Sequence, residues 1–352
     1  MAEPDDLVVR RPQGLYCPPG DFYIDPWRVV PRAIITHAHA DHARGGHGHY
    51  LCAREGEGVL RARLGRIPLQ TLDWGQTLDL NGVTVSLHPA GHVLGSAQVR
   101  LAHRGRVWVV SGDYKIEPDP TCTPFEPVRC DCFITECTFG LPIYRWPSAT
   151  EVFDDINAWW AGNVAAGRPS LLLGYSFGKV QRLLAGVDAG IGPLIVHRVI
   201  EPMNAAYRAA GIDLPETLSF DAVQDPALWS RALVLAPPSA ARGPTAHGLQ
   251  HPLQHARDAM ASGWMQLRSA RQRAGLDRGF VLSDHADWPG LVSAIAASGA
   301  ERIIVTHGQE AVLVRWLQEQ GLRAETMDTD YGDERANDAV GASATDSAQA
   351  SP

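Results

Sequence analysis

The segment ITHAHADHARGGH, residues 35–47, constrains this chain more than any other stretch, because it places four histidines and an aspartate in thirteen positions. A continuous helix is not expected there, since Gly45 and Gly46 follow at once and glycine is a poor helix former. We also do not expect this run to lie in a hydrophobic core, because each imidazole brings a hydrogen-bond donor and an acceptor that must be satisfied. The preceding residues RAII, 32–35, are typical of the end of a buried strand. The pattern predicts a strand that delivers a polar loop to the edge of a sheet.

Other histidines and an aspartate also follow apolar runs, where a strand would pass into a loop. They are His92 in AGHVLGS, Asp113 in SGDYK, His285 in SDHADW and His307 in VTHGQE. Three imidazoles and a carboxylate would bind one zinc-type ion, and a shared carboxylate would hold a second ion nearby. His37 and His39 are two residues apart and can point the same way in an extended loop. Asp41 and His42, further along the loop, can then turn towards the position of the second ion.

Small residues surround these side chains, and we expect them to keep bulk out of the metal shell: Ala38, Ala40, Gly91 and Gly112. The run HGLQHPLQH holds His251 and His255 four residues apart, but Pro252 separates them and no carboxylate joins them. We therefore do not expect a further metal site in that run.

The overall pattern predicts an α/β chain. Residues 1–140 are mostly strand-like, with an Asn-Gly turn signal inside TLDLNGVTVSLHPA. Further along, the apolar runs SLLLGYS and PLIVHR flank the helix-like GKVQRLLAGV, which indicates a βαβ unit with a parallel sheet. Histidine-bearing strand ends lie before and after this region. The simplest architecture is one catalytic domain made from both ends of the chain, with a domain inserted at 145–275.

Composition and charge narrow the class of protein. The net charge is −8, but residues 321–352 carry seven acids against two arginines, which is −5 and leaves −3 for the rest, so a nucleic-acid partner is not excluded. Residues 333–352 are rich in Ala and Ser without a folded-core composition, and we expect a disordered tail. No window is long and apolar enough for a membrane span, and the start has no apolar signal region. Six dispersed cysteines favour reduced thiols and a cytoplasmic location.

Seven motifs resemble those of a known enzyme family. THAHADH, AGHVLGS and SGDYK resemble the second, third and fourth motifs of the metallo-β-lactamase fold, and Asp25 in FYIDPW resembles the first. FITECT, SDHADW and VTHGQE resemble motifs A, B and C of the β-CASP nucleases, and YSFGKVQRLL and ASGWM resemble segments of their insert. The resemblance runs from about Gly14 to Tyr331 and is greatest to the bacterial ligase-associated DNA exonucleases, also known as mRNA 3′-end processing factors. It implies a metallo-β-lactamase αββα sandwich formed by residues 1–145 and 276–332, with an α/β β-CASP domain inserted at 146–275.

The resemblance also implies a role for each motif residue. His37, His39 and His92 would hold one divalent ion, and Asp41, His42 and His307 would hold a second. Asp113 would bridge the two ions, for which Zn²⁺ is expected and Mn²⁺ is the alternative. Asp25 would brace the metal loop, and Glu136 would orient a metal-ligating histidine. His285 would approach the scissile phosphate, where an imidazole can act as general acid near neutral pH, so the predicted catalytic residues are Asp41, Asp113 and His285.

Substrate contacts are predicted from basic residues in the insert. Arg268, Arg271 and Arg273 in WMQLRSARQR would bind phosphates, with a solvated helix face as the alternative. Ser176 and Lys179 in YSFGKVQRLL are further candidates.

The implied reaction is attack of a metal-bound hydroxide on a phosphodiester. The expected enzyme is a DNA exonuclease that acts on single-stranded ends in repair, in functional association with a DNA ligase and a helicase. An RNA-processing nuclease, similar to the mRNA 3′-end factors or to RNase J, stays open because His at the motif C position is typical of RNA-acting relatives. A small-molecule hydrolase shares the H-x-H-x-D-H run but would not need so large an insert. A non-catalytic binding module is not favoured, since no metal position in the motifs is degraded.

Overall fold

The computed structural model describes residues 6–242 and 253–331. Its contacts divide the chain into two compact units, one with residues up to Arg145 and from His285 onward, the other from Trp146 to Asp284. Sheets and helices occur in both units, which confirms the predicted α/β class. The predicted tail 333–352, together with His247 and His251, lies outside the described residues. None of the described helices is long and apolar enough to cross a membrane.

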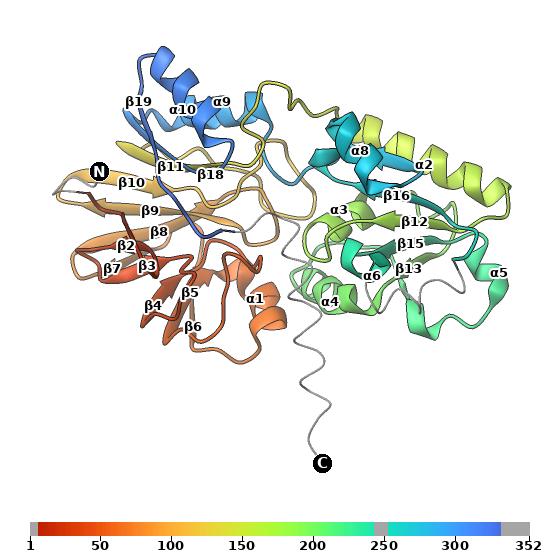
Figure 1. Cartoon of the computed structure of the whole chain (residues 1–352). Coiled ribbons are helices and arrows are strands. Elements are labelled where there is room, and N and C mark those ends of the chain that lie inside the picture. The colour runs from red at the N-terminus through yellow and green to blue at the C-terminus, as the bar shows by residue number, and fades with distance from the viewer. Residues whose placement is uncertain (1–5, 243–252, 332–352) are drawn as a thin grey trace. The chain divides into compact units, whose positions relative to one another are not determined.

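The first unit contains two sheets, seen in Figure 1 as separate sets of strands. Sheet A has six strands in sequence order: β1 (Val9–Arg11), β2 (Gly14–Cys17), β3 (Phe22–Ile24), β4 (Arg32–Ile34), β5 (His49–Ala53) and β6 (Leu69–Leu72). Sheet B has the order β19-β18-β11-β10-β9-β8-β7. Its strands are β7 (Thr77–Leu80), β8 (Val83–Pro89), β9 (Ala97–His103), β10 (Arg106–Val110), β11 (Cys132–Cys137), β18 (Arg302–Gly308) and β19 (Arg323–Thr326).

Alternating apolar residues join the two sheets face to face. In β8, Val83, Val85 and Leu87 are fully buried at every second position, which is the period of one face of a strand. They share one core cluster with residues of sheet A such as Leu15 and Ile34. Each sheet therefore supplies one apolar face to a common core, and the carboxyl ends of the strands are left to carry polar loops.

Helices cover the second apolar face of sheet B. The other face of sheet B packs against α9 (Trp288–Ser298) and α10 (Glu310–Glu319) through Ile295, Leu313 and Leu317. Figure 1 shows both helices beside β18 and β19. A shorter helix, α1 (Glu57–Leu64), connects the parallel strands β5 and β6.

The second unit is a parallel α/β layer. Its sheet has the order β14-β13-β15-β12-β16-β17, and its strand pairs are all parallel. The strands are β12 (Ser170–Leu173), β13 (Leu194–Val196), β14 (Leu218–Ser219), β15 (Leu233–Ala236), β16 (Arg257–Ala261) and β17 (Arg278–Phe280). The helices are α2 (Ala149–Ala165), α3 (Lys179–Gly186), α4 (Glu201–Ala209), α5 (Pro226–Trp229), α6 (Pro238–Arg242) and α8 (Arg268–Ala274). The βαβ unit predicted from SLLLGYS, GKVQRLLAGV and PLIVHR corresponds to β12, α3 and β13.

The end of the second unit differs from the position expected from sequence. The predicted insert ends at residue 275, whereas β17 lies after that residue and pairs with β16 in the sheet of the second unit. The chain leaves this unit between Asp284 and His285. The reason is that the short segment 278–280, just before SDHADW, forms the edge strand of the parallel sheet, so the unit continues up to the motif itself.

Candidate metal and catalytic centre

Strand direction explains why distant motif residues meet in the first unit. Strand β10 pairs parallel with β11, and β11 pairs parallel with β18. Strand β8 runs the same way as β10, because each pairs antiparallel with β9. The carboxyl ends of these four strands lie at one edge of sheet B, where they bring His92, Asp113, Glu136 and His307 together.

The histidine loop reaches this edge from sheet A. It begins after β4, and the Thr36 carbonyl accepts a 2.8 Å hydrogen bond from Ala97 N at the start of β9. Asp25 anchors the loop, because its carboxylate accepts hydrogen bonds from Thr36 N (2.7 Å) and from His42 Nδ1 (2.8 Å). Asp25 has a φ of 42°, in the left-handed region that costs a non-glycine residue about 1–3 kcal/mol. A residue with a strained backbone thus places a buried carboxylate that holds the loop at Thr36 and at His42.

Four residues form what we call the first histidine group: His37, His39, His92 and Asp113. One ligand atom of each lies within 4.8 Å of the others, and all four residues are buried. Asp113 Oδ2 is 3.5 Å from His37 Nε2 and 3.8 Å from His92 Nε2.

Asp113 also belongs to a second histidine group, with His42 and His307. Its Oδ1 is 3.2 Å from His307 Nε2, and its Oδ2 is 3.5 Å from His42 Nε2. Asp41 lies beside this group, with Oδ2 3.7 Å from His42 Nε2. The structure thus places Asp113 between the two groups and brings the predicted metal residues together around it.

The donor atoms fit divalent ions. Nε2 of His37 and Nε2 of His42 are buried and form no hydrogen bond within residues 6–242 and 253–331. A buried polar atom in this state costs about 1–3 kcal/mol unless something binds it. Each atom lies 3.5 Å from Asp113 Oδ2, a spacing suited to a histidine and a carboxylate that bind the same tetrahedral ion with bonds of about 2.0–2.1 Å.

The charge around the two groups favours a cation. Burial by itself would lower the pKa of His42, but the surrounding carboxylates, Asp113 first among them, raise that pKa to about 10. Burial lowers the pKa of His37 well below its ordinary value, and the nearby His42 adds to this effect. The raised pKa of His42 reflects an excess of carboxylate charge, which a bound cation would neutralise in place of the proton, and the neutral imidazole of His37 is already the form that ligates a metal.

A third cluster joins Glu136, His285 and Asp113. His285 Nδ1 lies 2.9 Å and 3.0 Å from the two carboxylate oxygens of Glu136, and both residues are buried. Glu136 also accepts a 2.9 Å hydrogen bond from Tyr114 N. The motif resemblance implied that Glu136 orients a metal-ligating histidine; in the structure the histidine that it contacts is His285, whose ring lies 4.5 Å from that of His92.

The glycines of the site serve backbone packing. Gly91 and Gly112 both have positive φ angles, of 72° and 58°. A Cβ on Gly91 would lie 2.5 Å from the Lys115 carbonyl oxygen, and a Cβ on Gly112 would lie 2.7 Å from Thr36 Cβ. Their predicted role was to leave room in the metal shell; the structure shows that they let neighbouring loops approach each other.

The predicted substrate contacts lie in the second unit, and they separate into two kinds. Arg268, Arg271 and Arg273 are exposed on α8, where they are available to an anionic ligand. Ser176 is half-buried in the loop before α3, and its carbonyl accepts a 3.1 Å hydrogen bond from Gln181 Nε2. Lys179 is 1% exposed and its ammonium contacts Asp284 Oδ2 at 2.9 Å, which argues against the predicted substrate contact for this residue.

Two residues at the site were not predicted from the sequence. Arg63 of α1 donates hydrogen bonds to the carbonyls of Ala38 and Ala43, which lie before and after His42 in the histidine loop. Tyr331, near the end of the described chain, stacks on the His42 ring. A basic residue on a helix and an aromatic residue after a final strand are common features, so neither pattern marked a site.

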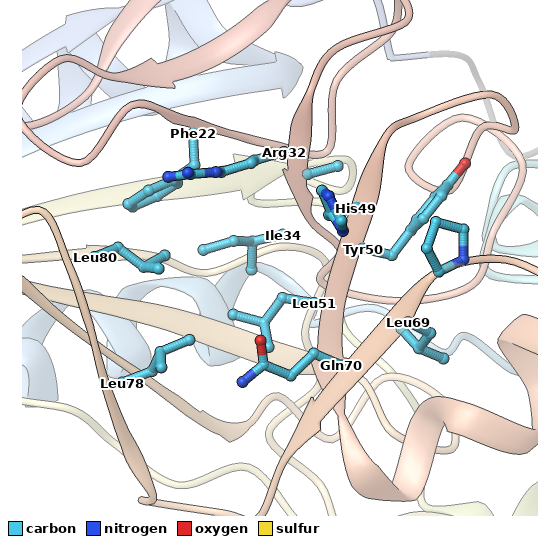
Figure 2. A pocket seen from close by; sticks show the side chains of 12 residues that line it. Phe22, Arg32, Ile34, His49, Tyr50, Leu51, Leu69, Gln70, Leu78 and Leu80 are labelled. Carbon is cyan, nitrogen blue, oxygen red and sulfur yellow. The ribbon is translucent and has the colours of Figure 1, made fainter.

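A separate cavity of about 410 Å³ lies in the first unit, along strands β3 to β7. Figure 2 shows its apolar lining, which includes Ile34, Leu51, Leu78 and Leu80, with Arg32, His49 and Gln70 among its polar groups. None of the residues that line it is an acid or belongs to the histidine groups. We therefore assign the chemistry to the histidine groups and not to this cavity, although a large apolar cavity is the usual first choice for a ligand site.

Comparison with known proteins gives partial matches. No protein-family model matches the chain. A "Probable DNA ligase" from Opitutus terrae is 31% identical over 320 residues, which is 90% of this chain and 30% of that protein. "Endoribonuclease ysh1" from Aspergillus fumigatus is 31% identical over 129 residues, 36% of this chain and 15% of that protein. This chain spans less than a third of either relative.

A solved structure of a protein of unknown function from Enterococcus faecalis V583 shares the fold. Its TM-score is 0.55 at 12% identity, and the match covers 86% of this chain and 80% of that chain. The seven motifs follow one another along the chain in the order of the family that they resemble. Their residues meet at one sheet edge, and one of the relatives is described as an endoribonuclease. Together with the motifs, these relatives support the β-CASP family of metallo-β-lactamase-fold proteins for this chain.

Proposed function

We propose that this chain is a two-metal phosphodiesterase that removes nucleotides from the ends of single-stranded DNA. The observation that supports this most strongly is the position of Asp113. Its two carboxylate oxygens reach members of both histidine groups, at 3.5 Å from His37 and 3.2 Å from His307. One carboxylate placed in this way can serve two ions, which is the arrangement of enzymes that hydrolyse phosphodiesters.

The chain's residues divide the work around the ions. Two bound divalent ions would lower the pKa of water and hold the phosphate oxygens. His37, His39 and His92 would hold the first ion, Zn²⁺ or Mn²⁺, and Asp41, His42 and His307 the second. Asp25 and Arg63 hold the loop that carries four of these ligands.

His285 is the proposed general acid. Glu136 binds its Nδ1, so Nε2 is the atom from which a proton can pass to the leaving oxygen. The buried carboxylate fixes the ring and its tautomer, a task that outer residues perform for catalytic and ligating histidines. His285→Ala should therefore keep its metal and cleave about 10²–10⁴-fold more slowly, the usual contribution of a positioned acid.

We assign the first unit to the metallo-β-lactamase αββα domain and the second to the β-CASP insert. Three exposed arginines of α8 would bind backbone phosphates: Arg268, Arg271 and Arg273. A protein whose net charge is −8 can still bind nucleic acid where its local charge is positive. A cytoplasmic location remains a prediction from the dispersed cysteines.

The choice of DNA rests on one relative. A protein described as a probable DNA ligase contains a stretch similar to 90% of this chain, which supports action on DNA ends beside a ligase. A helicase partner remains a prediction from the sequence. The RNA-processing alternative is kept because other relatives are described as endoribonucleases.

Four labelled substrates separate these functions: linear single strands with an end label and circular single strands with an internal label, each made as DNA and as RNA. The proposal predicts stepwise shortening of linear DNA, with slower loss of linear RNA and intact circles. Rapid cutting of either circle would make the protein an endonuclease. Faster loss of linear RNA than of linear DNA would move it to RNA processing, and His285→Ala run in parallel guards against a contaminating nuclease.

A further inference from the structure

The last described residues of the chain return to the histidine groups. After β19, Met327 N donates a 2.9 Å hydrogen bond to the Val305 carbonyl of β18. Arg10 Nε then donates to the Asp328 carbonyl at 2.7 Å, and Arg44 Nη2 donates to the Asp330 carbonyl at 3.4 Å. The segment is thus tied both to the first strand and to the loop that carries His42.

This path brings Tyr331 against two residues of the second histidine group. Its ring is nearly parallel to that of His42, with centroids 4.4 Å apart and an interplanar angle of 16°. It meets the His307 ring edge to face, at 5.4 Å and 80°. Trp27 packs on it from another side, at 5.6 Å and 82°. Within the described residues, its ring contacts involve only the second histidine group and Trp27.

We propose that Tyr331 is a positioning residue for the second metal ion. This inference rests on the two-metal function proposed above. Asp25 already binds Nδ1 of His42 and so directs Nε2 towards Asp113. Tyr331 adds a second restraint. Its stacked ring fixes the plane of the His42 ring, and its edge-to-face contact limits rotation of the His307 ring.

The space around Tyr331 argues against a substrate contact at this point. The cavity that it lines with Asp25, His42 and His307 has a volume of about 10 Å³. That is the size of a single water molecule at most, so no nucleotide can enter between these rings. Aromatic packing contributes about 0.5–1.5 kcal/mol beyond area burial and acts on the geometry of its partners.

The test measures the affinity of each metal site. Zn²⁺ or Mn²⁺ is titrated into the full-length, metal-free chain, and binding is followed by calorimetry. Three variants are compared: Tyr331→Leu removes the aromatic ring, Tyr331→Phe keeps it, and Trp316→Leu is the matched control. Trp316 is also half-buried in the first unit and makes an edge contact with Trp288 at 5.4 Å, but it belongs to the helical core away from the histidine groups.

For Tyr331→Leu we expect the second ion to bind about 10–100-fold more weakly, the usual effect of losing an outer partner of a ligand, with the first ion unchanged. Tyr331→Phe and Trp316→Leu should bind both ions like the wild type. Unchanged binding of both ions by Tyr331→Leu, or equal weakening of both, would overturn the inference while leaving the two-metal function intact. A wild-type chain that binds fewer than two ions would overturn both. If Tyr331→Leu does not fold, Tyr331→Met replaces it with the same expected results.

Discussion

His285 Nδ1 lies 2.9 Å from a carboxylate oxygen of Glu136, although 149 positions of sequence separate the two residues. The two residues meet within the first unit, because Glu136 lies in β11 near the carboxyl edge of sheet B and His285 is the residue with which the chain returns to this unit. The Glu136 carboxylate binds Nδ1 of His285 and so fixes the orientation of the ring.

The first prediction follows from this pair. Glu136→Gln should slow cleavage by at least about 100-fold, because an amide in place of the carboxylate can stabilise the wrong imidazole tautomer. Metal content should stay at the wild-type level. Thr138→Val is the control, since it removes a hydroxyl that donates to the same carboxylate but keeps the contact with His285. An unchanged rate in Glu136→Gln, or a loss of metal, would show that the pair has another role.

The second prediction concerns the shared carboxylate. Asp113→Ala should lose affinity for both ions and all cleavage activity, because Asp113 lies within reach of both histidine groups. Metal content after gel filtration, measured by elemental analysis, checks this directly. Glu126→Ala removes an exposed acid of the same unit and should behave like the wild type. Retention of two ions by Asp113→Ala would rule out the bridging role.

The third prediction concerns the stability of the second unit. Asp284 contacts Lys179 at 2.9 Å and Arg182 at 3.3 Å, and all three side chains are buried. Asp284→Asn leaves a buried ammonium and guanidinium without this carboxylate, so we expect a loss of about 3–5 kcal/mol in the free energy of unfolding. Lys179→Met should cost less, because Asp284 keeps Arg182.

Urea denaturation measures these losses, and Asp277→Asn is the matched control. Asp277 pairs with Arg257 at 3.1 Å on the surface, where such a pair contributes about 0–1 kcal/mol. Equal losses for Asp284→Asn and Asp277→Asn would contradict the structural role of the buried carboxylate.

The fourth prediction is a pH dependence at His47. Burial, with a smaller contribution from Arg44, lowers the pKa of His47 below 6.5. Its Nδ1 accepts a hydrogen bond from Val30 N at 3.3 Å, which requires the ring nitrogen to be unprotonated. The unfolded chain therefore takes up this proton first, so His47 contributes full stability above about pH 6.5 and loses it as the pH falls through the folded pKa.

His47→Asn removes this titration and keeps an acceptor. Melting temperatures at pH 7.5 and pH 5.5 should fall further on acidification in the wild type than in the variant. An equal fall in both would mean that His47 does not titrate differently in the folded and unfolded chains.

Local patterns in the sequence were sufficient for the α/β class and for the candidate metal residues. The histidine loop follows a strand. His92 and Asp113 follow strands of one direction, and His307 lies at the end of another, so short motifs at strand ends were enough to predict that these residues meet. Such patterns do not predict contacts between residues that are far apart in the sequence and belong to no motif. Tyr331 reaches His42 only because the chain returns past β1 after its final strand.

The same limit explains the other differences. Lys179 was a candidate substrate contact as a basic residue of YSFGKVQRLL, but its partner Asp284 lies 105 positions away and a sequence does not display that pairing. The boundary at 275 failed to include β17, since a three-residue edge strand carries too weak a pattern to separate it from the motif that follows.

The central claim is that two ions, held by the histidine groups, are required to hydrolyse nucleic acid. The most direct measurement adds Zn²⁺ or Mn²⁺ stepwise to chelator-treated protein and follows bound metal and cleavage of end-labelled linear single-stranded DNA in the same samples. We predict no cleavage without metal, and activity that rises as the second equivalent binds. Full activity in metal-free protein, or no cleavage of DNA or RNA with two ions bound, would contradict the account.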